Sequence, residues 1–312
     1  ARSQTAYQII VASNTEKLKN DDGDLWNTFK VSSNESINIE YQGAALQTGQ
    51  KCFWKVRVWD ESDMISDWSN TNFWGIGLLE PNAWKAQWIG YDAAKSDTTF
   101  KIQPRGNNIR LKSEYLPLPC PYFRKEFSLE SEFESATLYV TALGIYEVSI
   151  NGNRVGNDYF NPGWTDYRKR IYYNTYDVTQ LIKMGNNTIG SIISDGWYAG
   201  NIANRGQNYY GNNLRFRVQI LIQFSDGHID TIASDSTWRA SYGPILEADM
   251  QAGEAVDARL SMRGWNENGF HDKNWAMVRA IDTTTAPLLA YPGVPVRKTQ
   301  EIIPKKIFEP SP

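Results

Sequence analysis

The chain has 312 residues, of which 41% are hydrophobic and 13% are aromatic, including 12 Trp and 17 Tyr. This length is enough for about two domains, and the aromatic content favours β-strands. The 32 Lys and Arg residues are balanced by 35 Asp and Glu residues, giving a net charge of −3, which argues against a phosphate-binding basic surface and against nucleic acid as a partner. We expect no membrane span, because no apolar run approaches the roughly 18 residues that a span needs.

Residues 1–79 have the pattern of a small β-sandwich. The runs AYQIIVAS, INIEYQG and CFWKVRVWDE are rich in β-forming residues, and the alternation from Phe53 to Trp59 predicts a strand with one buried face. Trp68 and Ser69 follow near the expected last strand. This arrangement resembles a fibronectin type III module whose first strand is missing before Ala1, so we expect a fibronectin type III-like sandwich here.

Residues 80–121 are interpreted as a linker and a long loop. Pro81 and a change of rhythm in the sequence LLEPNAWKAQWIG mark the place where the β pattern stops. The stretch from 92 to 121 is polar and contains Pro117, Pro119 and Pro121 at its end. We therefore expect a boundary between two units in this region.

Residues 122–285 predict a second β-sandwich. Its strand-like runs are ATLYVTAL, YEVSINGNRV, TIGSIISDGWY, LRFRVQILIQF and HIDTIAS. The dipeptides Asn151-Gly152 and Asp226-Gly227 accept positive φ, so each is expected to close a hairpin. The last segment, 286–312, contains six prolines and is interpreted as an extended linker toward a missing downstream domain. The whole chain is thus expected to be all-β.

Two stretches of the second sandwich are dense in aromatic residues. Residues 194–213 place Trp197, Tyr198, Tyr209 and Tyr210 among asparagines and glycines, a mixture that suits a sugar ring. The alternative is a loop whose aromatic residues fill the core. In the stretch 161–178, arginines and a lysine alternate with tyrosines. Such a mixture can bind single-stranded nucleic acid, but with a balanced net charge we favour a strand with Arg side chains lying over aromatic faces.

The sequence gives little support for a catalytic centre. The two histidines, His228 and His271, are expected at the surface, and the two cysteines, Cys52 and Cys120, lie too far apart to indicate a disulfide scaffold. We find no G-x-S-x-G nucleophile elbow, no C-x-x-C, no H-E-x-x-H and no Gly-rich phosphate loop.

Carboxylates in EADMQAGEAVDAR leave one enzymatic alternative open. Glu247 with Asp249, and Glu254 with Asp257, have spacings at which a glycosidase-type acid and base pair is conceivable. The competing interpretations are solvated or Arg-paired side chains, and oxygen ligands of Ca²⁺. The oxygen donors available to such a cation are Asn201, Asn204, Asn212, Asn213, Glu254 and Asp257.

The region from Phe123 to the C-terminus resembles the N-terminal carbohydrate-binding domain of bacterial α-L-rhamnosidases, which is a galactose-binding-like jelly-roll β-sandwich. The matching pieces are FRKEF, ALGIYEVSINGNRVG, NPGWTDYRKRIYYNTYDVT, SDGWYAG, TWRASYGPIL, GEAVDAR, GWNENGFHDKNWAMV and VPVRKTQEIIP. Each piece is weak alone, whereas their order and spacing together are specific. The preceding module also resembles the first domain of those enzymes.

This resemblance implies an accessory role. In the family, catalysis belongs to a downstream α/α barrel that inverts the anomeric centre, so this chain would have no catalytic residues of its own. In some members the sandwich binds L-rhamnose with Ca²⁺, using a Tyr-Gly-Asp-Asn loop and a tryptophan that precedes an arginine. The matching positions are Tyr210, Gly211, Asn212, Asn213 and Trp238. Asn212 replaces the family's acid, which should weaken a Ca²⁺ site.

The expected function is therefore to bind or position rhamnose-containing glycans, and a purely structural spacer is the alternative. The candidate carbohydrate-binding residues are Asn212, Asn213, Trp238, Trp197 and Tyr210, and the candidate metal ligands are Asn212, Asn213, Glu254 and Asp257. The expected partners are such a glycan and the downstream barrel of the same protein. A periplasmic or extracellular location is favoured.

Overall fold

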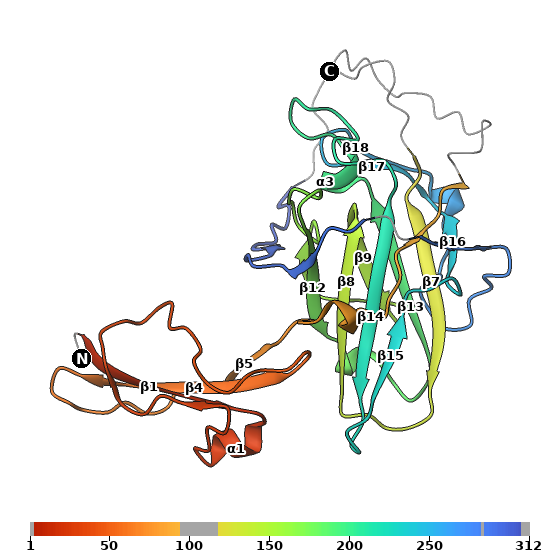
Figure 1. Cartoon of the computed structure of the whole chain (residues 1–312). Coiled ribbons are helices and arrows are strands. Elements are labelled where there is room, and N and C mark those ends of the chain that lie inside the picture. The colour runs from red at the N-terminus through yellow and green to blue at the C-terminus, as the bar shows by residue number, and fades with distance from the viewer. Residues whose placement is uncertain (1–2, 94–117, 282–283, 307–312) are drawn as a thin grey trace. The chain divides into compact units, whose positions relative to one another are not determined.

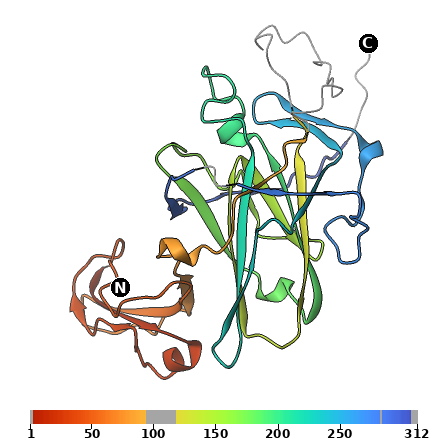
Figure 2. The same cartoon turned by 45° about the vertical axis from the view of Figure 1, so that its right-hand side comes forward.

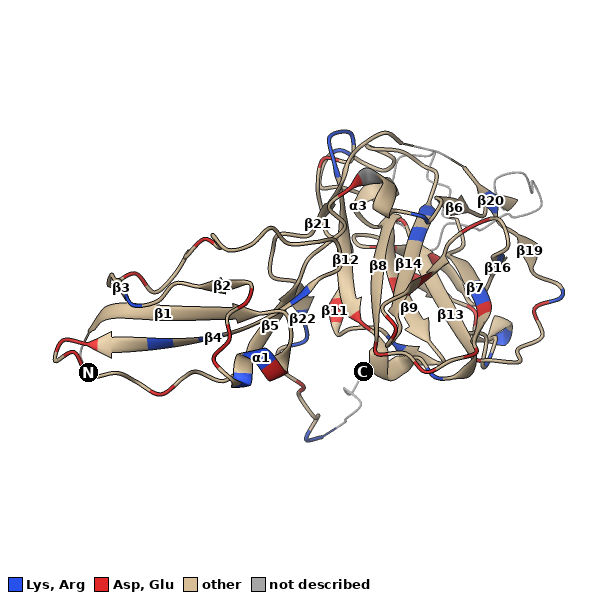
Figure 3. Ribbon diagram, turned by 60° about the horizontal axis from the view of Figure 1, so that its bottom comes forward, with Lys and Arg blue, Asp and Glu red and all other residues tan. Residues whose placement is uncertain are grey.

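The computed structural model describes residues 3–93, 118–281 and 284–306, and these residues are nearly all in strands and loops (Figure 1). None of the described helices combines the length and the apolar character that a membrane crossing needs. The chain divides into two compact units, Ala1–Trp84 and Lys85–Pro312. Figure 3 shows acidic and basic residues interspersed along both units, as the balanced net charge suggests.

The first unit is built on one antiparallel sheet. Its strands run in the order β2-β1-β4-β5, with β3 also pairing with β1. Their bounds are β1 (Gln4–Ala12), β2 (Trp26–Asn27), β3 (Val31–Ser32), β4 (Lys51–Asp60) and β5 (Asn72–Gly75), with the helix α1 (Thr15–Lys19) after β1 and the 3-10 turn η1 (Pro81–Ala83) at the end. Asn14 caps α1 by accepting from the backbone N–H of Lys17 at 2.9 Å.

The expected single buried face of β4 is not seen. Apart from Cys52 and Lys55, the residues of this strand are half-buried on both sides. One side is covered by Trp68, whose ring lies 4.4 Å from the Arg57 guanidinium and 4.9 Å from the Lys55 ammonium. Cationic side chains can cover an aromatic ring and still reach water, which explains why this face is not sealed.

The second unit is a sandwich of two sheets (Figure 2). Among the described residues, one sheet has the order β10-β9-β13-β7-β16-β19, and the other has the order β20-β6-β14-β8-β12-β21, with β15 pairing with β14. The strands of the first sheet are β7 (Pro121–Leu129), β9 (Ile145–Ile150), β10 (Asn153–Arg154), β13 (Gly185–Ser194), β16 (Arg239–Tyr242) and β19 (Ala276–Met277). Those of the second are β6 (Ile89–Gly90), β8 (Ser135–Leu143), β12 (Ile171–Asp177), β14 (Arg215–Gln223), β15 (Ile229–Ala233), β20 (Arg279–Ala280) and β21 (Leu288–Ala290).

Shorter elements complete this unit. They are the pair β11 (Asp158–Tyr159) with β22 (Val296–Arg297), the hairpin of β17 (Ile245–Asp249) with β18 (Gly253–Val256), the helix α3 (Gly196–Ala199), and the 3-10 turns η2 (Thr179–Leu181) and η3 (Ala258–Leu260). Both predicted hairpins are confirmed. Asn151 and Gly152 have φ of 50° and 81° between β9 and β10, and Gly227 has φ of 87° between β14 and β15.

The core of the sandwich lies between the two sheets. Phe123 of one sheet stacks on Phe216 of the other with ring centroids 5.9 Å apart, and Trp238 meets Phe216 edge to face at 6.1 Å. All three side chains are fully buried. Burying a large apolar side chain contributes about 1.5–3 kcal/mol, so this layer is a main source of stability.

The structure differs from the expected domain map at both ends of the sandwich. Residues 85–93 belong to the second unit, where Ile89 of β6 pairs with Phe216, and residues 94–117 of the expected linker lie outside the described residues. In the expected C-terminal linker, β21 pairs in parallel with β12, and β22 pairs with β11. The partners of β21 and β22 are more than 100 residues earlier in the chain, so local sequence gives no sign of them.

Candidate functional site

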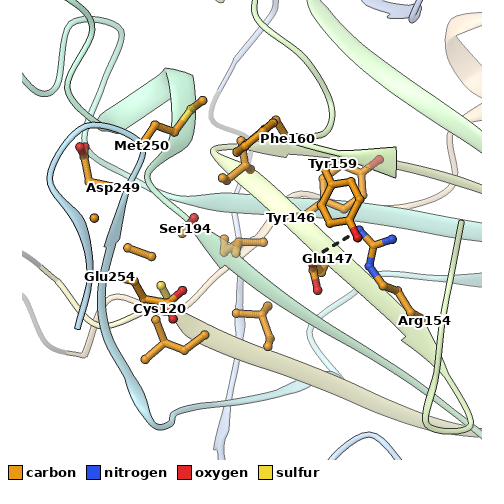
Figure 4. Close-up of a pocket in the computed structure, with 16 residues that line it drawn as sticks. Cys120, Tyr146, Glu147, Arg154, Tyr159, Phe160, Ser194, Asp249, Met250 and Glu254 are labelled. Carbon is orange, nitrogen blue, oxygen red and sulfur yellow. Dashed lines mark hydrogen bonds and ion pairs between the residues drawn. The ribbon is translucent and has the colours of Figure 1, made fainter. Parts of the chain in front are cut away.

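A pocket of about 470 Å³ lies beside β9 and β13 in the second unit. Figure 4 shows its lining in two groups, with Asp249, Met250, Glu254 and Cys120 on one side and Tyr159, Phe160 and Arg154 on the other. Tyr146 and Ser194, from β9 and β13, lie between them. The pocket is thus lined by four chain segments that are far apart in the sequence.

The wall formed by the β17–β18 hairpin is held in place by Asp249. This buried carboxylate accepts the backbone N–H groups of Gln251 and Ala252, both at 2.8 Å, which fixes the hairpin turn. It also accepts the N–H of Asn201 at 2.7 Å, which ties the hairpin to the end of α3. Glu254 lies opposite Ala248 in the hairpin and is exposed. Asp249 therefore has a structural role, whereas Glu254 can meet a ligand.

The opposite wall is organised by Arg154. Its guanidinium pairs with Glu147 at 3.3 Å, donates to the carbonyl of Gly156 at 3.0 Å, and lies 4.7 Å from the ring centroid of Tyr159. The Glu147 carboxylate and the Tyr159 ring are both substantially exposed. This wall offers a charged hydrogen-bonding pair beside an aromatic face, a combination that can bind hydroxyl groups and an apolar ring face.

Two buried groups of the pocket lining, the Cys120 thiol and the Tyr146 hydroxyl, are not reactive. Burial raises the pKa of the Cys120 thiol, and the nearby Asp195 and Glu254 carboxylates act in the same direction. A thiol held in its protonated form is a poor nucleophile. The hydroxyl of Tyr146 donates to the Asn174 side-chain oxygen at 2.8 Å, and burial raises its pKa well above the usual range. These features suit binding better than covalent chemistry.

A stacked tryptophan pair is connected to this pocket through α3. Trp197 on α3 stacks on Trp164 with ring centroids 5.4 Å apart and an interplanar angle of 16°, and Trp164 is 53% exposed. Gly196, with φ of 50°, packs so closely on Ile145 of the pocket lining that a Cβ would lie 2.4 Å from the Ile145 side chain. Glycine is therefore required where α3 meets the pocket.

The two aromatic stretches of the sequence meet in this region. Tyr167, from the stretch 161–178, packs against Tyr198 and Tyr210 of the stretch 194–213 at ring-centroid distances of 5.3 and 5.2 Å. The Arg168 guanidinium lies 5.1 Å from the Tyr209 ring and 5.4 Å from the Tyr210 ring. For Arg168, the prediction that Arg side chains of the stretch 161–178 lie over aromatic faces is confirmed. Much of the aromatic content is packing, with Trp164 as its exposed member.

The structure corrects the role expected for Trp238. Its side chain is fully buried in the sandwich core, and its indole N–H donates to the carbonyl of Ala233 at 3.0 Å. No face of this ring is open to a sugar. Trp238 directly precedes β16, and its side chain lies on the core-facing side of that strand. The tryptophan before Arg239 is therefore a core residue.

The other predicted carbohydrate-binding residues lie in or beside the aromatic region. Trp197 and Tyr210 are partly buried and pack against the small cluster around Tyr167. Asn212 and Asn213 are exposed and follow Tyr210 in the same loop. Trp164, Arg154 and Tyr159 were missed by sequence reasoning. Trp164 was visible within an aromatic stretch, but its pairing with a residue 33 positions later was not.

The predicted metal ligands do not form one carboxylate centre. Asp257 accepts the backbone N–H of Arg259 at 3.0 Å and pairs with the Arg259 guanidinium at 2.6 Å, while Glu254 lines the pocket. Within the part of the chain that the structure describes, no group of three or more His, Cys, Asp or Glu side chains is placed to hold a metal ion. Both histidines are exposed, as expected, and the His228 ring stacks on Phe224.

Comparisons with known proteins match both units. Residues 131–300 match the family model described as the α-L-rhamnosidase N-terminal domain, and residues 1–80 match that of the Rha78A-like N-terminal immunoglobulin domain. An α-L-rhamnosidase of Formosa agariphila is 40% identical over 286 residues, which are 91% of this chain and 30% of that protein. One from Alteromonas sp. is 36% identical over 305 residues, 96% of this chain and 32% of that protein.

Solved structures show the same relationship. The α-L-rhamnosidase from Dictyoglumus thermophilum superposes with a TM-score of 0.80 at 36% identity, covering 96% of this chain and 32% of that one. The Streptomyces avermitilis α-L-rhamnosidase complexed with L-rhamnose gives a TM-score of 0.83 at 25% identity, covering 96% of this chain and 43% of that one. The chain thus spans about a third of the length of the two curated relatives from Formosa agariphila and Alteromonas sp..

Proposed function

This chain belongs to the family of α-L-rhamnosidase N-terminal domains, and from that membership we propose that it is the non-catalytic accessory region of an α-L-rhamnosidase. We further propose that its second unit binds rhamnose-containing glycans. Relatives about three times as long carry further domains, so we assign the hydrolytic reaction to a part of the parent enzyme outside this chain, in a downstream α/α barrel.

One observation supports sugar binding above the others, namely the half-exposed Trp164 ring stacked on Trp197, whose chain neighbour Gly196 packs on Ile145 of the pocket lining. A flat indole face suits the apolar face of a pyranose, and for rhamnose also its deoxy methyl group. The Trp197 ring behind it keeps this face in a fixed orientation, which lowers the entropy lost on binding. The pocket volume of about 470 Å³ lies within the range of small-ligand sites.

The pocket lining supplies the polar part of this proposed site. Glu254 and Glu147 offer carboxylate oxygens that accept hydrogen bonds from sugar hydroxyls, and Arg154 offers N–H donors. Hydrogen bonds to charged groups contribute about 1.5–3 kcal/mol when they are shielded from water and less when exposed. These groups favour a polyhydroxy ligand over an apolar one.

A cation could add to binding through the Tyr210 loop. Asn212 and Asn213 carry amide oxygens of the kind that Ca²⁺ accepts, and we keep them as its proposed ligands. Asp257 is removed from this set because its carboxylate is paired with Arg259. Because the remaining set is poor in negative charge, we propose that any Ca²⁺ affinity is low.

A glycan microarray probed with the 1–312 chain, with and without a chelator, tests this proposal. We expect signal on glycans with terminal rhamnose, and a clear reduction of that signal in the Trp164→Ala variant. A partial loss of the microarray signal when the chelator is added would assign a role in glycan binding to Ca²⁺. If no glycan retains the chain under either condition, the second unit is a structural spacer between other domains.

A further inference from the structure

The first unit contains a hollow of about 500 Å³ that is separate from the site described above. It lies between β2, β3 and the segment that follows β3. Its lining residues are Tyr7, Trp26, Asn27, Thr28, Val31, Glu35, Asn38, Ile39, Glu40 and Gln42. Two aromatic rings, three side-chain amides and two carboxylates therefore border one cavity within a single unit.

The walls of this hollow are held by contacts within the unit. The Trp26 ring meets Tyr41 edge to face at 5.3 Å, and the Tyr41 hydroxyl bonds to the carbonyls of Leu25 at 3.1 Å and Ala44 at 2.8 Å. On the other side, the side-chain amide of Gln4 donates to the carbonyl of Glu35 at 2.8 Å. The segment after β3 is thus attached to the sheet at both ends of the cavity.

Most polar side chains of the lining are available to a ligand. Within residues 3–93, 118–281 and 284–306, the side chains of Glu35, Asn38, Glu40 and Gln42 make no hydrogen bond or ion pair, and neither do the Tyr7 hydroxyl and the Trp26 indole N–H. By contrast, the Asn27 oxygen is occupied, because it accepts from the Gln8 side chain and the Phe29 backbone, both at 2.9 Å. The cavity therefore combines aromatic rings with hydrogen-bond donors and acceptors that the protein does not use internally.

The charge of the lining limits the class of ligand. Two carboxylates border the cavity, and none of the lining residues is Lys, Arg or His. A uronic acid or a sulfated sugar would be repelled by Glu35 and Glu40. An uncharged sugar fits better, because its hydroxyls can donate to the carboxylates and its ring can contact Tyr7 or Trp26.

We propose that this hollow is a second saccharide-binding site, specific for an uncharged sugar unit. It would give each unit of the chain a saccharide-binding site of its own. Two weak sites on one chain raise the overall affinity for a repeating polymer without any new contact at either site. The proposal stands on the first unit alone and does not depend on the tryptophan pair of the second.

Saturation-transfer NMR on the 1–312 chain in a Trp164→Ala background isolates this hollow. The probes are three uncharged methyl glycosides, those of L-rhamnose, D-glucose and D-galactose, and the anion D-galacturonate. We expect transfer to at least one methyl glycoside, and at least tenfold weaker binding of D-galacturonate. The double variant Glu35→Gln, Glu40→Gln should reduce the difference in affinity between the neutral methyl glycosides and D-galacturonate.

Two further variants and one control variant keep the result interpretable. Trp26→Ala should weaken binding at least tenfold, and because Trp26 packs on Tyr41, the exposed pair Asn38→Gly, Gln42→Ala serves as a second test that spares the fold. Phe73→Ala, which truncates another exposed aromatic side chain of this unit, is the matched control and should leave binding unchanged. The proposal is overturned if no methyl glycoside gives transfer, or if the Trp26 and Asn38/Gln42 variants bind like the control.

Discussion

Replacing Trp238 and Trp164 by alanine separates packing from binding in the second unit. Trp238 is fully buried and donates its indole N–H to Ala233, so its truncation leaves a cavity and an unpaired carbonyl. Truncating a buried Trp costs about 3–5 kcal/mol, and 1 kcal/mol shifts the melting temperature of a unit this size by roughly 2–4 °C. We therefore expect Trp238→Ala to lower the melting temperature of the second unit by roughly 6–20 °C.

Trp164→Ala should change stability little and should affect sugar binding strongly. This ring is 53% exposed and stacked on one side only, so its loss should cost no more than about 1 kcal/mol, or roughly 2–4 °C. Binding of L-rhamnose by the second unit should be lost. Differential scanning calorimetry is the appropriate assay, because two units need not unfold together and the transition of the second can be followed separately. Trp238→Phe, which keeps most of the buried ring, is the matched control. A Trp238→Ala chain with native melting and no sugar binding would refute this assignment.

Three further predictions concern the candidate site and two buried tyrosines of the sandwich. The isolated chain should not hydrolyse p-nitrophenyl α-L-rhamnoside; turnover above buffer that is abolished by Glu254→Gln or Asp257→Asn would instead show a catalytic carboxylate pair. Asn212→Asp should strengthen Ca²⁺ binding in calorimetry, since it adds an anionic oxygen, and unchanged affinity would remove this loop from the proposed metal site. Burial raises the pKa of Tyr122 and of Tyr139 to about 12, so both stay protonated in the folded state while the unfolded chain ionises near pH 10. The free energy of unfolding should therefore keep its full value below pH 10 and fall by roughly 2–3 kcal/mol per tyrosine between pH 10 and 12, which urea unfolding midpoints would measure. Each Tyr→Phe variant should lose less over this pH range. An equal loss would contradict ionisation of the buried tyrosines as the cause.

Local sequence was sufficient for the fold class and the hairpins. Alternating runs predicted strands because the side-chain period of a strand is two residues, and Asn151-Gly152 predicted a turn because both residues tolerate positive φ. The aromatic stretches around Trp164 and Trp197 also marked the region of the candidate site. In each case the signal lay within one short segment.

Long-range pairing was beyond the sequence. The short strand β21 lies between prolines, yet it pairs in parallel with β12. Nothing in the residues of β21 indicates that β12 is its partner. The same limit explains Trp238, because a motif gives the identity of a side chain and not the face of the sheet that it occupies.

Calorimetric titration of L-rhamnose into the 1–312 chain tests the central claim most directly. A Trp26→Ala background weakens binding at the hollow in the first unit at least tenfold, so that its contribution to the heat is small. The account predicts one weak site with a dissociation constant in the millimolar range, or roughly 4 kcal/mol, because a small exposed sugar makes few contacts. Adding Trp164→Ala should abolish the binding heat. Equal heats with and without Trp164, or no heat in either chain, would contradict a rhamnose site at the tryptophan pair.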